Sequence, residues 1–254
     1  MGVINVTPDS FSDGGLHLRL EPAVTEAWGM LEAGAAIIDV GGESTRPGSE
    51  GVSVEEELRR VEPVLADLGG APVSIDTSKA AVARRALDLG VELVNDVTAL
   101  RGDPELAGVV ADAGCYLCLM HMLGEPRTMQ EDPRYDDVVS EVKCFLEDRL
   151  AFAVAAGIRE ELVCLDPGIG FGKTAAHNFE LVRRLDDLVA IGRPIVIGFS
   201  RKSTLGKLTG QATGSAAASV GAAVAAFDRG ATILRVHDVR EHVEALAAAK
   251  AVAG

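Results

Sequence analysis

The chain has 254 residues, 48% of them hydrophobic, and its 38 Asp and Glu against 24 Lys and Arg give a formal net charge of −14. This length and composition predict a single domain with a large core, spanning residues 1–254. The excess of acidic residues argues against a non-specific nucleic-acid binder and a membrane-surface protein, since both need broad basic faces, so we expect small-molecule partners, with no nucleic acid and no membrane.

Eight short apolar runs recur along the chain, and helical patterns lie between them. The runs cover residues 2–6, 37–40, 73–75, 93–94, 116–120, 162–165, 194–199 and 233–236. Strands of a parallel sheet are buried on both faces, so they appear as continuous apolar runs separated by helices. Eight such repeats, with no Pro/Gly/Ser-rich linker between them, favour an α/β fold of the (β/α)8 TIM-barrel type over an open doubly wound sheet.

Capping residues and apolar spacing mark several helices. Ser53 and Glu56 have the spacing of a capping box at the start of a helix predicted to end near residue 65. A second helix is predicted over 80–87, with Gly90 behind its C-terminal end. Further helices are predicted over 138–156, 178–188 and the alanine-rich tail 245–253, and Trp28 is predicted to lie in the core.

Cysteine content and the lengths of the apolar runs bear on the compartment. Four cysteines are too few for a disulfide framework, and Cys115 and Cys118 lie three apart in a predicted strand, where they point to opposite faces. No apolar run approaches the roughly 18 residues that cross a bilayer, and the N-terminal residues lack the pattern of a signal peptide. We therefore expect a cytoplasmic protein with reduced cysteines.

Polar side chains stand at the C-terminal end of every predicted strand. In chain order they are Asn5, Asp39 with residues 43–46, Asp76, Asn95 with Asp96, His121, Asp166, Lys202 with Ser203, and Arg235 with His237. Any one of them could be a capping or turn residue, but the strand ends of a barrel meet at the face where sites are built. The early carboxylates and amides suit a heterocycle rich in hydrogen-bond donors, and the late cations suit an anion.

Long motifs in one order resemble those of the dihydropteroate synthase family over nearly the whole chain. They are GVINVTPDSFSDGG at 2–15, IDVGGESTRPG at 38–48, SIDT at 74–77, VND at 94–96, LMHM at 119–122, LDPGIGFGK at 165–173, SRKS at 200–203 and RVHD at 235–238. The resemblance implies an enzyme of folate synthesis that joins 6-hydroxymethyl-7,8-dihydropterin pyrophosphate to p-aminobenzoate. Pyrophosphate and 7,8-dihydropteroate are the implied products, sulfonamides the implied inhibitors, and a homodimer the implied assembly.

The resemblance also implies a role for each candidate residue. The pterin would be bound by Asp76, Asn95, Asp166 and Lys202, with Met120 and Phe171 flanking its ring. The pyrophosphate would be bound by Arg235, His237, Thr45 and Arg46, and a Mg²⁺ cofactor by Asn5. The p-aminobenzoate would be held by Ser203, Phe11 and Pro47, and the catalytic set would be Asp13, Lys202, Arg235 and His237.

Other interpretations of the same residues stay open at this point. A pterin-dependent methyltransferase would share Asp76, Asn95 and Asp166, although it has no use for a pyrophosphate pocket. A paralogue without turnover would bind pterin only. Residues 166–174 look like a phosphate-binding loop, but Pro167 takes the place of its first required glycine. His121 suits a structural role better than a functional one, and Arg201 has no predicted role.

Overall fold

Strands and helices alternate along the chain in a computed structural model that describes residues 1–7, 16–45, 48–49 and 51–253. The strands are β1 (Gly2–Asn5), β2 (Ile38–Gly41), β3 (Val73–Asp76), β4 (Leu93–Asp96), β5 (Tyr116–Met120), β6 (Val163–Asp166), β7 (Val196–Ile197) and β8 (Ile233–Leu234). The helices are α1 (Leu16–Glu32), α2 (Val54–Asp67), α3 (Ala80–Asp88), α4 (Leu106–Ala113), α5 (Val138–Ala155), α6 (Ala175–Arg183), α7 (Leu185–Val189), α8 (Ser203–Thr209), α9 (Ala216–Phe227) and α10 (Val239–Ala253), and a short 3-10 helix covers Glu160–Leu162.

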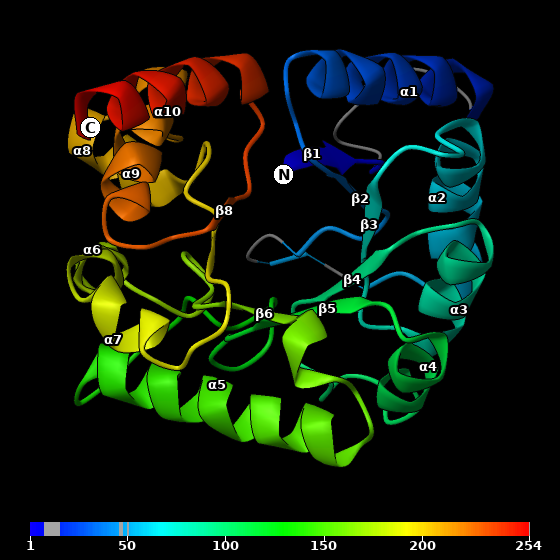
Figure 1. Ribbon diagram of the computed structural model, residues 1–254, viewed down its shortest axis with the longest axis horizontal. Coiled ribbons are helices and arrows are strands. Elements are labelled where there is room, and N and C mark those ends of the chain that lie inside the picture. The colour runs from blue at the N-terminus through cyan, green and yellow to red at the C-terminus, as the bar shows by residue number, and fades with distance from the viewer. Residues whose placement is uncertain (8–15, 46–47, 50, 254) are drawn as a thin grey trace.

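The strands close into a parallel barrel. Strands β1 to β6 pair in chain order, and β7 pairs with β8. Parallel bridges join the two parts: Leu165 pairs with Ile195 beside β7, and Gly2 pairs with Val236 beside β8. The amide of Val236 donates to the carbonyl of Met1 at 2.9 Å, which ties the last strand to the first. Figure 1 shows the helices as a ring around these strands, and the predicted (β/α)8 TIM barrel is confirmed.

The barrel interior has an apolar floor and a polar layer above it. The floor contains Leu93, Cys118, Cys164 and Val196, packed with Met1, Ile37 and Ile233. Residues two positions farther along a strand face the same side, so the next layer is formed by Asp39, Asn95, Met120, Asp166, Gly198 and Arg235. The polar residues predicted at the strand ends therefore stand over a sealed floor.

Helices cover the outer face of the barrel through a continuous apolar layer. Helix α1 buries Ala23, Ala27 and Met30 against the strands. Trp28 is 42% exposed, so its predicted core position is wrong. It follows Ala27 by one residue, a rotation of about 100° away from the buried stripe. The small alanines on that stripe let α1 lie close to the sheet and leave the indole outside.

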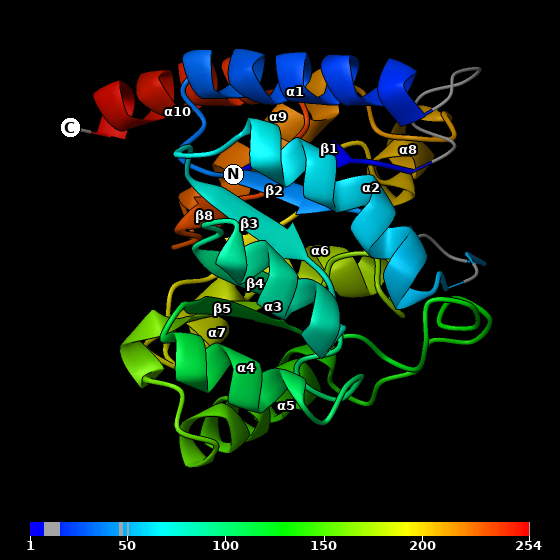
Figure 2. The same cartoon turned by 90° about the vertical axis from the view of Figure 1, so that its right-hand side faces the viewer.

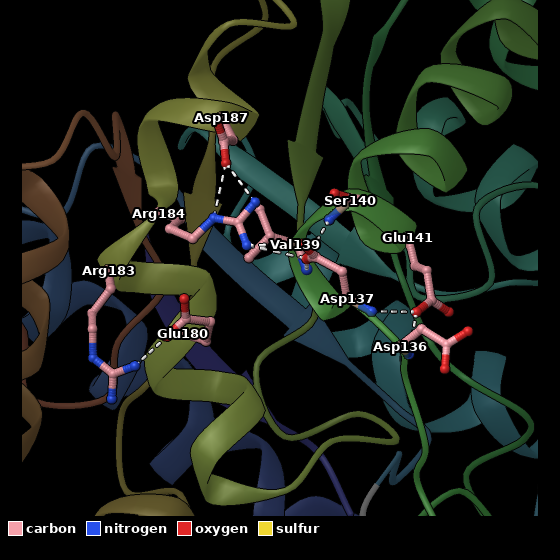
Figure 3. Close-up of polar contacts among 9 residues, drawn as sticks. All are labelled: Asp136, Asp137, Val139, Ser140, Glu141, Glu180, Arg183, Arg184 and Asp187. Carbon is pink, nitrogen blue, oxygen red and sulfur yellow. Dashed lines mark hydrogen bonds and ion pairs between the residues drawn. The ribbon is translucent and has the colours of Figure 1, made fainter.

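One helix predicted over 178–188 is two helices in the structure. Helix α6 begins earlier than predicted, because Thr174 Oγ1 accepts from the amide of His177 at 3.2 Å and the His177 ring accepts from the amide of Thr174. The helix ends before Arg184, which leaves helical geometry at φ −110° and ψ 36°. Figure 3 shows Arg184 bound to Asp137, at the start of α5, and to Asp187. These ion pairs hold the break, and apolar spacing alone does not reveal them.

Other local predictions hold in part. The amide of Glu56 donates to Ser53 Oγ at 3.2 Å, so Ser53 caps α2, but the Glu56 carboxylate binds Arg59 and Arg60 and does not complete the predicted capping box. Cys118 lies in the barrel floor and Cys115 packs on the outer core, so the two point apart as predicted. Within the described residues, no helix has the length and apolar character needed to cross a bilayer.

Candidate functional site

Loops after the strands gather at one end of the barrel. In Figure 2 the segment between β5 and α5 projects from this end, beside the loop that precedes α2. The predicted site residues Asn5, Asp76, Asp166 and Asn95 lie at the ends of β1, β3, β6 and β4. Four others, Phe11, Asp13, Arg46 and Pro47, lie outside the described residues. The rest come together around the polar layer.

Asp39 is the centre of that layer, and its carboxylate is fully buried in β2. It accepts hydrogen bonds from Ser74 Oγ at 2.6 Å, from Asn95 Nδ2 at 3.0 Å and from Arg235 Nε at 2.6 Å. The bond from Asn95 fixes which amide atom faces Asp39, so the Asn95 oxygen faces away and remains an acceptor. Asp39 therefore orients two of the predicted site residues.

Arg235 directly follows β8, and its side chain crosses the barrel to contact β2 and β3. Its guanidinium binds Asp39, and Nη2 lies 2.8 Å from Asp76 Oδ2. The side chain is 21% exposed. Burial raises the pKa of Asp76 to about 7, while the neighbouring guanidinium opposes that rise. Arg235 is thus a neutralised member of the polar layer, and it occupies one oxygen of the Asp76 carboxylate.

Lys202 lies between this layer and the loop after β6. Its ammonium donates to the carbonyl of Ile169 and lies 4.6 Å from the centre of the Phe171 ring. Gly198 lies beside it, since a Cβ there would be in ordinary van der Waals contact with Lys202 Nζ at 3.8 Å and Arg235 Cβ at 3.9 Å. Burial lowers the pKa of Lys202 to about 8, and the charge of Asp166 acts against that shift. The lysine remains mostly charged at neutral pH.

Asp166 and Met120 complete the inner wall beside Lys202. Asp166 is buried, and its Oδ1 accepts from the amide of Gly168 at 2.7 Å. Burial raises the pKa of Asp166, while Lys202 lowers it. Met120 is 3% exposed and packs in a small apolar cluster that also contacts Phe171. An acceptor, a cation and two apolar side chains therefore face the same space.

His237 was predicted as part of a cationic cluster, but its ring is neutral at pH 7. Burial, followed by the charges of Arg201 and Arg235, lowers the pKa of His237 to about 4. Ser200 Oγ accepts from the His237 amide at 3.1 Å and lies 3.0 Å from its Nδ1. If the Ser200 hydroxyl donates to Nδ1, Nε2 carries the proton and is a hydrogen-bond donor for an anion.

Arg201 has a structural role that its sequence position did not reveal. It has left-handed backbone geometry at φ +56°, and its amide donates to Ser219 Oγ at 3.0 Å. Its guanidinium forms a two-point ion pair with Asp238, at 3.2 and 2.5 Å. Arg201 therefore ties the loop after β7 to the loop after β8 and is not part of the polar layer.

The remaining predicted residues lie around the rim. Thr45 is half-buried in the loop after β2, and Ser203 is the exposed first residue of α8. Asn5 is half-buried, and its Oδ1 lies 3.7 Å from the position of a Cβ on Gly41. In the part of the chain that the structure describes, no three His, Cys, Asp or Glu side chains form a metal site. A metal here would need ligands from elsewhere, such as substrate phosphates.

Comparison with known proteins bears directly on this arrangement. A family model described as pterin binding enzyme matches residues 1–237. Dihydropteroate synthase of Escherichia coli is 48% identical over 251 residues, which cover 97% of this chain and 88% of that protein.

The chain belongs to the family of pterin-binding enzymes that includes dihydropteroate synthase.

Solved structures agree with this assignment. The Yersinia pestis dihydropteroate synthase, in complex with a sulfonamide drug, has a TM-score of 0.92 at 45% identity and covers 99% of this chain and 93% of its own. The Xanthomonas albilineans enzyme with 4-aminobenzoic acid has a TM-score of 0.92 at 46% identity, and its complex with 7,8-dihydropteroate has a TM-score of 0.89 at 44% identity; each covers 100% of this chain and 92% of its own. The family resemblance drawn from the sequence is confirmed.

The sequence does not reveal the roles of two residues of this pterin-binding enzyme, Asp39 and Ser200. The sequence places Asp39 at a strand end without indicating its role, although it contacts Ser74, Asn95 and Arg235. The available signal was a carboxylate in the middle of an apolar strand, where it must be paired. Ser200, which binds His237, carries no comparable signal because a serine after a strand is common at turns.

Another buried ion pair holds the loop that contains Thr45. Lys79, before α3, binds Glu43 in that loop and Glu57 in α2; the Glu57 contact is 2.5 Å. Glu57 is fully buried, and its Oε1 has no partner among the described residues. Glu57 therefore depends on Lys79 for its counter-charge.

We expect Lys79→Met to destabilise the protein by about 3 kcal/mol or more, because it leaves the Glu57 charge buried and unpaired. The double variant Lys79→Met with Glu57→Leu should recover most of that loss, since it removes the charge as well. Urea unfolding measures both, with the half-buried Lys143→Met as control. Equal stability of the single and double variants would contradict the assigned pairing.

Proposed function

We propose that this chain catalyses the dihydropteroate synthase reaction, joining 6-hydroxymethyl-7,8-dihydropterin pyrophosphate to p-aminobenzoate with release of pyrophosphate. The observation that carries the proposal is the buried polar layer that contains Asp76, Asn95 and Asp166, with Lys202 near enough that the charges of Asp166 and Asp76 affect its pKa. A pterin presents a row of N–H donors and a few ring acceptors, which such a layer can pair in a closed pocket.

The pterin pocket follows from the contacts of these four residues. Asp39 orients Asn95, so that the Asn95 oxygen faces the pocket as an acceptor, and Arg235 occupies one oxygen of Asp76. The remaining carboxylate oxygens accept from the pterin, and Lys202 donates to a ring acceptor. Phe171 and Met120 supply the apolar walls. A ligand lacking one donor would leave a buried acceptor unpaired, at a cost of about 1–3 kcal/mol.

Breaking the carbon–oxygen bond develops negative charge on pyrophosphate, so donors beside that group lower the barrier. We assign this role to His237, Thr45 and Arg46, while Arg235, paired with Asp39 and Asp76, holds the polar layer together beside them. His237 is neutral in the free protein, so it would donate a hydrogen bond from Nε2. The negative charge of a bound phosphate would raise its pKa and favour the imidazolium as the leaving group departs.

A Mg²⁺ ion would fit this leaving-group side. Asn5 offers a hard amide oxygen, and Mg²⁺ is commonly held by one or two protein oxygens together with phosphates and water. The ion would neutralise the charge on the departing pyrophosphate. Asp13, in the loop after β1, would assist the metal or offset charge on the pterin methylene. Magnesium dependence is part of the proposal.

The aryl amine of p-aminobenzoate is neutral at pH 7, so it can attack without a strong general base. We place its carboxylate at Ser203, the first residue of α8, and its ring between Phe11 and Pro47. Sulfonamides, which resemble p-aminobenzoate, should compete for that place. We further propose that residues 1–254 act as one domain, as a homodimer and in the cytoplasm.

A pyrophosphate-release assay tests the proposal. Release should require the pterin pyrophosphate, p-aminobenzoate and Mg²⁺ together, and the product should be dihydropteroate by mass spectrometry. Asp76→Ala should abolish pterin binding in calorimetry, whereas Lys143→Met, on the outer helix α5, should match the wild type. Pterin binding without any pyrophosphate release would instead support a paralogue without turnover.

We expect pterin affinity to be highest between about pH 7 and 8. Above the Lys202 pKa of about 8 the lysine loses its proton and one charged donor, and below the Asp76 pKa of about 7 the carboxyl becomes protonated and accepts less well. Calorimetry from pH 5.5 to 9.5 measures both limbs. Lys202→Met should remove the basic limb and Asp76→Asn the acidic limb; a flat wild-type profile would contradict both assignments.

A further inference from the structure

The loop after β6, residues 167–174, is built to lie against the segment after β5. Gly168, Gly170 and Gly172 have φ values of +69°, +84° and +63°. A Cβ on Gly168 would lie 1.9 Å from the carbonyl oxygen of His121, and one on Gly172 would lie 2.7 Å from that of Leu123. The close approach of the loop to its neighbour therefore requires glycine at both positions.

Lys173 lies inside this loop, and its ammonium is surrounded by acceptors. Nζ is 3.1 Å from the carbonyl of Gly168, 3.0 Å from that of Phe171 and 2.8 Å from His121 Nδ1, and the residue is 3% exposed. Carbonyl oxygens can only accept, and a fourth, longer contact of 3.5 Å joins Nζ to the carbonyl of His121, so acceptors take up every N–H donor of Lys173. Burial lowers the pKa of Lys173 well below its ordinary value. This lysine has no donor left for a phosphate, which removes the phosphate-binding interpretation of residues 166–174.

His121 is suited to accept from Lys173. Burial, with the charges of Lys173 and Arg101, lowers the pKa of His121 to about 2, so the ring is neutral. Its ring packs edge-on against Phe145, with centroids 4.8 Å apart. An acceptor at Nδ1 places the proton on Nε2. His121 therefore anchors the Lys173 ammonium to the end of β5.

The opposite side of the same loop contacts Lys202. The carbonyl of Ile169 accepts from Lys202, and the Phe171 ring lies against its ammonium. The amide of Phe171 donates to the Gly168 carbonyl at 3.0 Å, which is one of the two carbonyls bound by Lys173. Lys173 thus binds the carbonyls on one side of the turn, while the other side of the turn contacts Lys202, the proposed pterin-binding lysine.

We propose that Lys173, anchored by His121, is a positioning residue for the pterin pocket: it holds the loop after β6 in the shape that presents the Ile169 carbonyl and the Phe171 ring to Lys202. The inference rests on the proposed function, because the pocket it organises is the pterin pocket. Lys173 itself touches no substrate. Its effect on the reaction passes through Lys202.

The test replaces Lys173 with side chains of similar length and fewer donors. Lys173→Met should weaken binding of the pterin pyrophosphate by at least tenfold in calorimetry, with Lys173→Gln between it and the wild type because its amide keeps two donors. The KM for p-aminobenzoate should change less than twofold. The basic limb of the pH profile of pterin binding should move to lower pH, since Lys202 loses two contacts that favour its charged form. Lys143→Met is the matched control.

A second pair of variants tests the anchor. His121→Asn retains an acceptor near the position of Nδ1, whereas His121→Leu has none, so only His121→Leu should reproduce the Lys173→Met result. Hydrogen exchange of a peptide covering 167–174, in ligand-free protein with a native circular dichroism spectrum, should be faster in Lys173→Met and His121→Leu than in the wild type.

Four outcomes decide the proposal. Wild-type exchange in the loop of Lys173→Met, or an unmoved basic limb with unchanged pterin affinity, would overturn it. Equal losses for both substrates would indicate general destabilisation and also overturn it. If the wild-type chain binds no pterin, the proposed function fails and the link to Lys202 fails with it, while the exchange measurement still decides whether Lys173 holds the loop.

Discussion

Replacing Arg235 with methionine should abolish turnover, weaken pterin binding and destabilise the protein by about 3–5 kcal/mol, because it leaves two buried carboxylates without their counter-charge. Arg235 lies 2.6 Å from Asp39 and 2.8 Å from Asp76. A variant that only lost pyrophosphate affinity, as a simple anion-binding role predicts, would keep the binding of pterin itself. The pairing with both carboxylates predicts that this binding is weakened as well.

A second substitution separates the two effects. Asp39→Asn in the Arg235→Met background removes one unpaired charge, so it should recover part of the stability in urea unfolding without restoring turnover. Arg201→Met is the matched control, because Arg201 also binds an aspartate, Asp238, but its side chain is 56% exposed. Arg201→Met should lower the free energy of unfolding by no more than about 1 kcal/mol. Similar losses at Arg201 and Arg235 would contradict the assigned role of the polar layer.

We expect Gly168→Ala to be the most damaging addition of a single methyl group at the proposed site. The new Cβ would lie 1.9 Å from the carbonyl oxygen of His121, so the loop after β6 must move away from β5. A left-handed residue other than glycine costs about 1–2 kcal/mol, and the displaced backbone adds lost hydrogen bonds. We expect a total loss above about 3 kcal/mol and no measurable pterin binding.

Gly192→Ala controls for the backbone term alone. Gly192 also has left-handed geometry, at φ +86°, but a Cβ there meets nothing within 4 Å. Its substitution should cost about 1 kcal/mol and leave pterin affinity unchanged. Thermal unfolding and calorimetry measure both variants. If Gly168→Ala were no worse than Gly192→Ala, the close approach of the loop to His121 would be refuted.

The barrel was predictable because each buried strand is a short apolar run, and because helices between such runs force a parallel sheet. What the runs could not predict depends on contacts distant in sequence. The break at Arg184 is held by Asp137, which lies 47 residues earlier. Trp28 stays outside because the neighbouring alanines pack more closely against the sheet. A single tryptophan in a helix does not indicate which face of that helix is buried.

For the site, the sequence predicts the positions of residues but not their partners. The positions of Asp76, Asn95, Asp166 and Lys202 follow from the rule that parallel strands end at one face. Their partners do not follow from that rule. Arg235 and His237 were grouped as cations by their spacing, yet one is neutralised by Asp39 and Asp76 and the other loses its proton through burial. Charge state depends on the assembled interior, which spacing does not encode.

The closing bridge from Arg235 to Asp39 spans 196 positions of the sequence. While the chain is being synthesised, β2 and β3 would emerge long before β8, with Asp39 and Asp76 still lacking the guanidinium that stabilises them. A partial barrel would therefore meet mutual carboxylate repulsion at its centre, and arrival of the last strand would relieve it. We therefore expect the pocket to be complete only once the last strand has joined the barrel.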